Sequence, residues 1–174
     1  MDRNWSGPGE YREIIQVGGV SIDLETLTET GSFSVLIKPV MNPVLSEYIV
    51  ALTRITNERV AVDGVDFVSG VRAFLAFAAG RSLFCYGRDD KVIVANAKLL
   101  GVREVWPAVR AFDLKDWLLR VGIPLAGIHS GALAAHVGGI SQGVGHDALT
   151  DSRSLAAAIR YLVERGAPNP LAGS

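Results

Sequence analysis

Residues 145–163 read GHDALTDSRSLAAAIRYLV and carry the clearest helical pattern in the chain. Apolar side chains recur there every three or four residues, which is the spacing of one face of an amphipathic helix. Two chemically versatile residues, His146 and Asp151, stand at the N-terminal end of this pattern. A carboxylate can hold a divalent cation, and a neutral imidazole can accept a proton from water. The stretch therefore predicts a long helix with a candidate site at its start.

The rest of the chain alternates between strand-like and helix-like segments. Two β-branched, apolar runs at residues 14–23 and 33–37 frame a short polar connection, which is typical of a hairpin. Asp66 suits the N-cap of a later helix and Gly80 its end. Further strands are expected at residues 82–86 and 108–112, and helices at 46–52, 66–79, 89–100, 113–121, 130–137 and 149–163. This order predicts an α/β fold, with a mixed β-sheet flanked by helices.

Length and composition indicate one globular domain. The chain has 174 residues, of which 49% are hydrophobic and 20% charged, and this composition is sufficient for a sizeable core. We expect residues 1–165 to form that domain and residues 166–174, GAPNPLAGS, to be a flexible C-terminal tail. The net charge of −1 excludes a protein-wide basic field, so any polyanion must be bound locally or through metal ions.

Cysteine content and hydropathy bear on the cellular compartment. The single cysteine, Cys85, excludes an intramolecular disulfide and agrees with a reducing environment. No apolar run reaches the ~18–20 residues of a membrane span, and the polar start of the chain does not resemble a signal peptide. These features predict a cytoplasmic protein without a membrane partner.

Other motif-like strings are weaker. Residues 143–148, GVGHDA, fit the glycine pattern of a dinucleotide site, but no strand is evident before them, so a nucleotide-binding oxidoreductase is a minor alternative. Ser130 follows His129 without forming a nucleophile elbow, and we expect it to cap a short helix. One cysteine and three scattered histidines also argue against a structural zinc site.

Six segments, taken in order, point to a known family. They are EIIQVGGV at 13–20, FSVLIKP at 33–39, NP at 42–43, LTRIT at 52–56, YGRDD at 86–90 and the segment with His146 and Asp151. Their order and spacing resemble the DEDDh group of 3′–5′ exonucleases, which have an RNase H-like fold. The resemblance extends from about Glu13 to Val163, although no single segment is highly specific. One departure is Arg54, where relatives often have glycine.

The resemblance implies hydrolysis of 3′-terminal phosphodiesters in single-stranded RNA or DNA, with two Mg²⁺ or Mn²⁺ ions and a histidine general base. On this basis Asp90 and Asp151 are metal ligands and His146 is the base, while Asp89 is a rival ligand one position away. Without the resemblance, the acids would be read as ordinary first-turn helix residues, which the helix dipole favours, and His146 as a surface histidine.

The resemblance also bears on the binding of the nucleic acid. It places part of the strand-binding edge within residues 42–56, so Tyr48 and Arg54 are the expected substrate contacts. Aromatic stacking with a few cations suits a single strand better than a uniformly basic face does. Packing of Tyr48 beneath its own helix is the alternative. Because dimers are common among the relatives, a homodimer is compatible with the resemblance.

The family's first motif, Asp-x-Glu on the opening central strand of the sheet, has no counterpart before Glu13. Asp23 and Glu25 imitate it, but they follow a strand that relatives place in the outer hairpin, so we interpret them as part of a hairpin turn. Loss of a central strand would leave the backbone groups of its neighbours unpaired. We therefore expect an internal recorded start and a marginally stable chain. The alternative is a non-catalytic nucleic-acid- or protein-binding module on the same fold.

Overall fold

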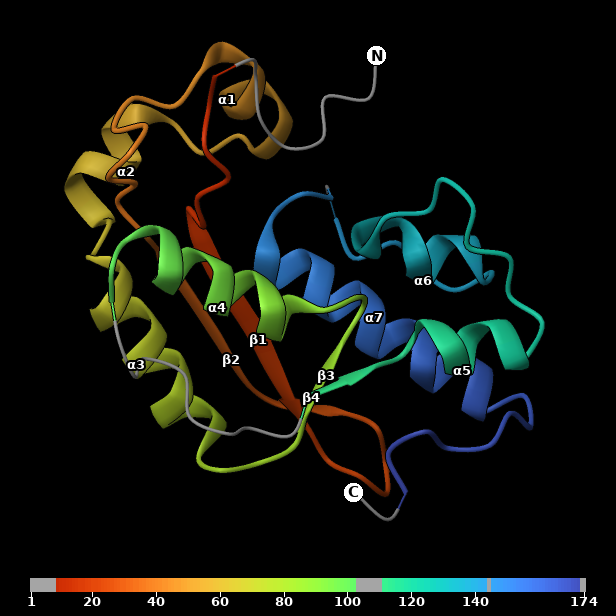
Figure 1. Cartoon of the computed structure of the whole chain (residues 1–174). Coiled ribbons are helices and arrows are strands. Elements are labelled where there is room, and N and C mark those ends of the chain that lie inside the picture. Colours follow the sequence, from red (N-terminus) through yellow and green to blue (C-terminus); the bar gives the residue numbers. More distant parts are fainter. Residues whose placement is uncertain (1–8, 103–110, 144, 173–174) are drawn as a thin grey trace.

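The computed structural model describes residues 9–102, 111–143 and 145–172. Helices cover both faces of short strands, as expected for an α/β fold, with α4 in front of the strands and α7 behind them in Figure 1. The strands are β1 (Gln16–Ile22), β2 (Glu29–Leu36), β3 (Leu83–Cys85) and β4 (Ala111–Asp113); the helices are α1 (Glu47–Thr53), α2 (Asn57–Asp63), α3 (Phe67–Ala78), α4 (Asp89–Leu99), α5 (Lys115–Arg120), the 3₁₀ turn η1 (Ser130–Ala132), α6 (Leu133–His136) and α7 (Ala148–Val163). Within the described ranges, no helix has the length and apolar character that a membrane crossing requires.

The N-terminal hairpin matches the sequence expectation. Strands β1 and β2 are antiparallel, in a register that runs from Gln16 opposite Leu36 to Ile22 opposite Glu29. At the turn, the Asp23 carboxylate accepts hydrogen bonds from the backbone N–H of Glu25 (3.0 Å) and Thr26 (2.8 Å). Bonds from Thr26 hold the pKa of Asp23 below its ordinary value. The acid therefore closes the turn, which confirms its assignment to the hairpin end.

The second strand pair forms a sheet of its own. Strands β3 and β4 are parallel, and α4 makes part of the crossover between them. The expected strand at 108–112 is described only from Ala111, because residues 108–110 lie outside the described ranges. The single mixed sheet that we expected is therefore represented by two two-stranded sheets in the described part of the chain.

A cavity of about 920 Å³ lies between the two sheets and is lined by both β1 and β3. No strand of the described ranges lies in this space. The Ile37 N–H donates to the Ile15 carbonyl on the β2 side (2.9 Å). Because backbone groups alternate along an antiparallel strand, those of Gln16, Gly18 and Val20 point away from β2, toward the cavity. Helices α3, α4 and α7 supply mostly apolar side chains to the remaining walls.

Strand β1 fixes the start of α7. The Gln16 side chain donates to the Asp147 carboxylate (2.7 Å) and accepts from the Ala148 N–H (2.9 Å). Asp147 is the N-cap of α7 and accepts a hydrogen bond from the Thr150 N–H (2.9 Å). Gly18 permits this close approach, since a Cβ there would lie 2.5 Å from the Leu149 nitrogen. The N-terminal end of α7 is therefore held directly against the hairpin.

This contact predicts a stability difference between two neighbouring glycines. In Gly18→Ala the added methyl meets helix backbone, which cannot turn aside, so we expect a loss of about 1–3 kcal/mol of unfolding free energy, as for overpacked cores. That loss corresponds to a fall of roughly 3–10 °C in melting temperature. The control is Gly19→Ala, where the methyl would lie 3.1 Å from the Phe74 ring edge, a side chain that can rotate. Equal melting temperatures for the two variants would contradict the packing argument.

Two local features refine the sequence expectations for the helices. Asp66 caps α3 by accepting from the Ser69 N–H (2.9 Å), and Gly80 follows the helix end with a φ of 74°, both as expected. Helix α2 was not expected. It has only seven residues, and helices of that length are marginal without tertiary contacts. Its Val60 is buried in a small cluster with Leu36 and Ile55, which supplies such contacts.

The residues after α7 are packed rather than loose. Leu171 is buried in the main core, which also contains Leu118 and Ile159. The Trp117 indole donates to the Pro168 carbonyl (3.0 Å). Residues 166–172 therefore differ from the flexible tail that we expected, because Leu171 anchors them in the main core.

Candidate active site

His146 and Asp151 meet at the N-terminal end of α7. His146 lies just before the Asp147 N-cap and has a φ of 70°, in the left-handed region. In this turn its backbone N–H donates to Oδ1 of Asp151, at 3.0 Å. One helical turn separates the cap from Asp151, so the carboxylate folds back over the helix end. The structure thus brings together the two residues that the sequence singled out in this segment.

A residue from another element completes the environment of Asp151. The Ser130 hydroxyl donates to its Oδ2 at 3.0 Å, so each carboxylate oxygen accepts one hydrogen bond. Ser130 therefore does not cap a helix as we expected; its side chain turns to the site instead. Burial raises the pKa of Asp151 above its ordinary value, while the Ser130 hydrogen bond opposes the shift. No Lys or Arg of the described ranges forms a salt bridge with this partly desolvated carboxylate, which a cation would stabilise.

The His146 ring is stacked on a second imidazole. The ring centroids of His129 and His146 are 4.6 Å apart, and their planes meet at 28°. Burial lowers the pKa of His146, and the nearby His129 lowers it further. Both effects favour the neutral imidazole, which is the form that accepts a proton, while the Asp151 charge opposes them.

Asp89 and Asp90 begin α4 but have different surroundings. Arg88 binds both oxygens of Asp90, at 2.9 and 2.6 Å, and holds the pKa of Asp90 below its ordinary value. The Asp89 side chain is partly open to solvent. The protein atoms packed around its carboxylate nevertheless remove part of its hydration and raise its pKa, and the negative charge of nearby Asp113 raises it further. Both acids line the 920 Å³ cavity, as Asp151 does. Sequence spacing alone could not distinguish these two environments.

Cys85 lies behind these acids. Burial, together with the charges of Asp89 and Asp90, raises the pKa of its thiol to about 12. The thiol therefore stays protonated at physiological pH and is a poor metal ligand or nucleophile.

Asp90 and Asp151 are suitable ligands for a divalent ion, but they do not form a complete coordination shell by themselves. Mg²⁺ is commonly bound by one or two carboxylates, with waters and substrate phosphates completing its shell. Asp90 and Asp151 both line the 920 Å³ cavity and match that pattern in residue type. In the described part of the chain, however, no three His, Cys, Asp or Glu side chains converge as a ready-made metal cluster.

Asp23 and Glu25 also line the 920 Å³ cavity, but at the end of β1 opposite to the one that contacts α7. Gln16 at the start of β1 contacts the α7 end, whereas Asp23 follows the far end of the strand. Seven residues at about 3.3 Å per residue separate the two ends by roughly 23 Å. A metal ion needs its oxygens within about 2–2.6 Å. The geometry agrees with the interpretation that these acids form a hairpin turn.

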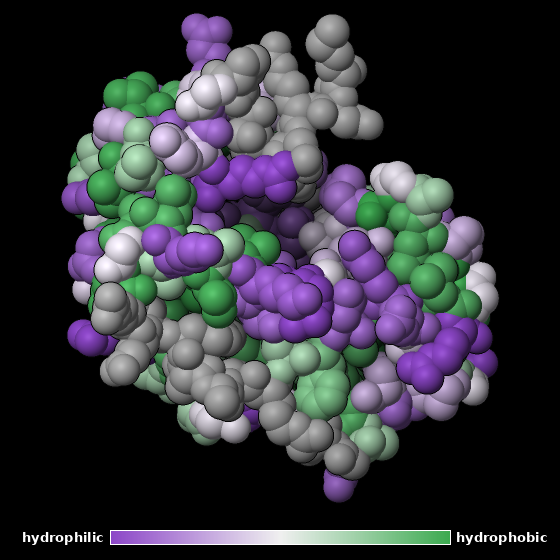
Figure 2. All heavy atoms as spheres, in the orientation of Figure 1, coloured by the Kyte–Doolittle hydropathy of each residue, from purple (hydrophilic) through white to green (hydrophobic). Residues whose placement is uncertain are grey.

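A smaller pocket of about 240 Å³ adjoins the His146–Asp151 pair. Its other walls come from the N-terminal segment and from residues 39–55, including Tyr11, Asn42 and Ile49. Figure 2 shows a hollow on this face, between the α1 region and α6, with hydrophilic residues along its rim.

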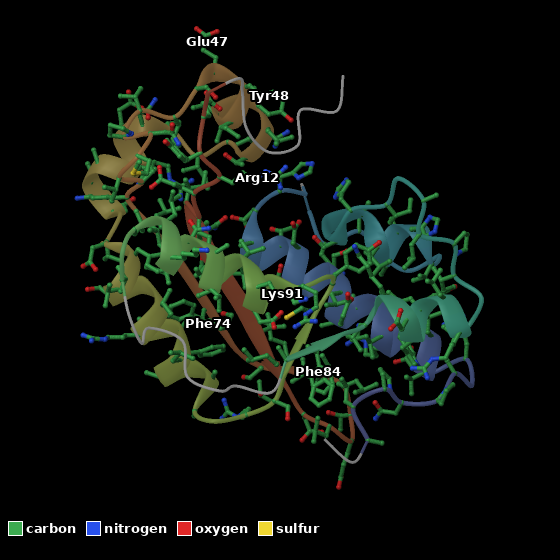
Figure 3. All side chains as sticks on the ribbon, viewed as in Figure 1. Arg12, Glu47, Tyr48, Phe74, Phe84 and Lys91 are labelled. Atoms are coloured by element: carbon green, nitrogen blue, oxygen red, sulfur yellow. The ribbon has the colours of Figure 1, made fainter. Side chains whose placement is uncertain are left out.

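The expected substrate contacts lie near this pocket but do not form its wall. Tyr48 is half-buried on α1, near the top of Figure 3, and Lys91 is exposed on α4, near the middle of that view. Arg54 is exposed and ends α1 with a φ of 61°, a conformation that glycine adopts without strain. Neither Tyr48 nor Arg54 is among the described residues that line the pocket. Arg153 binds Glu29 through two hydrogen bonds, at 3.0 and 2.8 Å.

Solved structures that resemble this chain include nucleases. The nuclease domain of 3'hExo, described as a DEDDh family member bound to rAMP, is 21% identical over 92% of this chain and 86% of that chain, with a TM-score of 0.78. A 3'-exonuclease described in recognition of the histone mRNA stem-loop is 19% identical over 92% of this chain and 76% of that chain, with a TM-score of 0.77. Cell-death related nuclease 4 (CRN-4) is 22% identical over 89% of this chain and 58% of that chain, with a TM-score of 0.73. No curated protein matches the chain in sequence.

The family assignment comes from the sequence match to a family model. The model, RNase T, described as Exonuclease, matches residues 5–159, which is most of the chain. The structural likeness supports the same RNase H-like nuclease fold. The protein therefore belongs to the RNase T exonuclease family and has the fold of the DEDDh exonucleases.

Proposed function

We propose that the protein is a metal-dependent 3′–5′ exonuclease that removes nucleotides from single-stranded RNA or DNA. Membership of the exonuclease family supports the hydrolytic class of reaction. The observation that carries the proposal is the pairing of His146 with Asp151 at the α7 end, where both residues line the 240 Å³ pocket.

Asp90 and Asp151 are the proposed metal ligands. A bound Mg²⁺ or Mn²⁺ would stabilise negative charge on the phosphate as a Lewis acid. The Arg88 pair does not prevent Asp90 from taking this role, because the Arg88 side chain is 49% exposed. An exposed ion pair contributes only about 0.2–1 kcal/mol, so Asp90 can exchange Arg88 for a cation.

His146 is the proposed general base. Its neutral imidazole would take a proton from the attacking water, and its position beside Asp151 would place that proton transfer next to the bound phosphate. The adjoining pocket would receive the terminal nucleotide, and Tyr48 and Arg54 would contact the strand farther from the reacting end. Among the described residues no three His, Cys, Asp or Glu side chains form a metal cluster, so waters and substrate phosphates would supply the remaining ligands.

The direct test is a time course with a 5′-labelled single-stranded oligonucleotide and Mg²⁺ or Mn²⁺. A ladder of products that shorten one nucleotide at a time from the 3′ end is expected. A parallel reaction with a 3′-blocked oligonucleotide should stay intact. Internal cleavage of the blocked substrate would contradict the exonuclease proposal.

A matched pair of variants distinguishes the two adjacent acids. Asp90→Asn is expected to lower activity by about 100-fold, because losing one charged ligand removes part of the several kcal/mol that a metal contributes. Asp89→Asn should lower activity by less than about tenfold, since Asp89 would act only through the local field. The measurement is kcat at saturating Mn²⁺, with melting curves to verify folding. The reverse order of effects would assign the ligand role to Asp89.

A second candidate function is binding of nucleic acid without cleavage. It is favoured by the lack of a three-residue metal cluster in the described part of the chain. Fluorescence anisotropy with the same oligonucleotide separates the two proposals: binding with no product under any metal condition would support the binding module.

A further inference from the structure

The segment that precedes α6 packs closely on the candidate site. A Cβ at Gly145 would lie 2.6 Å from Cε1 of His129, so the backbone before His146 passes directly over the His129 ring. The next residue, Ser130, donates its hydroxyl to Asp151. Two consecutive residues of this segment therefore contact the two halves of the site, and they do so from more than fifteen positions away in the sequence.

The His129 and His146 imidazole rings contact each other face to face. The centroid separation of 4.6 Å and the 28° angle describe a stacked pair, an arrangement that aromatic rings favour over random contact. His146 lies in a left-handed turn before α7, not within the helix itself. The stacked His129 ring is therefore one of the contacts that can set the orientation of the imidazole in this turn.

His129 itself does not face the cavities. The described residues that line the 920 and 240 Å³ spaces include Ser130, Asp151 and His146, but not His129. A group outside both spaces is not placed to touch a substrate there. The stacked His146 ring is the site group through which His129 is placed to influence the reaction.

We propose that His129 is a positioning residue whose ring, by stacking, holds the His146 imidazole in the orientation that proton transfer requires. This inference rests on the proposed nuclease function. It assigns the role to the ring face of His129 rather than to its charge or hydrogen bonding. An aromatic replacement should therefore preserve the role, and an aliphatic side chain of similar size should not.

The test compares His129→Phe with His129→Leu. His129→Leu is expected to lower kcat about tenfold with KM for the oligonucleotide unchanged, because a small misplacement of a reacting group is costly. His129→Phe should stay within about twofold of the wild type, since it keeps a stacking ring. Equal losses in both variants, or an unchanged kcat in His129→Leu, would overturn the proposal. Melting curves establish that both variants are folded.

A second readout does not depend on activity. The chain has three histidines, so the ring-proton resonances of His146 can be assigned in the NMR spectrum with a His146→Ala variant. They should move in His129→Leu, because the neighbouring ring current is lost, and stay near their original positions in His129→Phe. Unmoved resonances in His129→Leu would overturn the stacking role. If the wild-type protein cleaves nothing, the proposed nuclease function fails, and the resonances alone decide whether His129 orients His146.

Discussion

Asp151→Asn is expected to lower the rate of 3′-end hydrolysis by at least about 10³-fold. The loss of a metal-binding charge removes several kcal/mol of transition-state stabilisation, and each 1.36 kcal/mol is a factor of ten. The substitution keeps the size of the side chain but cannot accept both the Ser130 hydroxyl and the His146 N–H as a carboxylate does. The measurement is kcat/KM on the labelled oligonucleotide across a Mn²⁺ titration.

The stability of this variant should not follow its activity. Burial raises the pKa of Asp151 in the folded state. The ionised carboxylate at pH 7 therefore opposes folding, and this cost to the stability of the protein is lost as pH falls and the carboxylate becomes protonated. Neutral Asn relieves this desolvation, which offsets the lost hydrogen-bond acceptor, and the melting temperature should stay near that of the wild type. The control is Asp116→Asn, an exposed first-turn acid of α5, which should change neither property. An Asp151→Asn protein with more than about a tenth of wild-type activity would exclude the ligand role.

His146→Gln is expected to lower kcat by about 10²–10⁴-fold, the usual contribution of a general base. Gln retains a polar side chain of similar reach but cannot take up a proton at neutral pH. Binding of the oligonucleotide should be little changed, because the base acts on the attacking water and not on the strand.

The matched control for this variant is His136→Gln. His136 bonds to the Pro124 carbonyl in another part of the fold (2.7 Å), so its loss should leave kcat within about twofold of the wild type. Anisotropy measures binding and the labelled time course measures kcat. A His146→Gln protein that loses affinity but keeps its kcat would make His146 a binding residue and would contradict its role as the base.

Local sequence signals were sufficient where neighbours in the chain decide the structure. The apolar spacing after Leu149 predicts α7, because a helix repeats every 3.6 residues whatever it packs against. Asp66 and Gly80 mark the ends of α3, and Asp23 marks the hairpin turn, since each acts on backbone groups within three residues. The same locality places His146 beside Asp151 across the first turn of one helix.

Long-range packing decided what the sequence pattern left open. Ser130 resembles a helix cap in sequence, but its hydroxyl reaches Asp151, 21 residues away. The separate roles of Asp89 and Asp90 depend on which of them meets Arg88 and which meets Cys85. These partners have no fixed spacing, and no local periodicity encodes them.

The sequence by itself determined the α/β class, the family resemblance and the His146–Asp151 pair, because these depend on residue type, order and short spacing. Only the tertiary structure decided that His129 and Ser130 join that pair, that β1 and β3 border a cavity, and that Leu171 is buried. The physical reason is the range of the interactions: helix periods, caps and turns act over a few residues, whereas stacking, burial and desolvation depend on which distant segments share the same space.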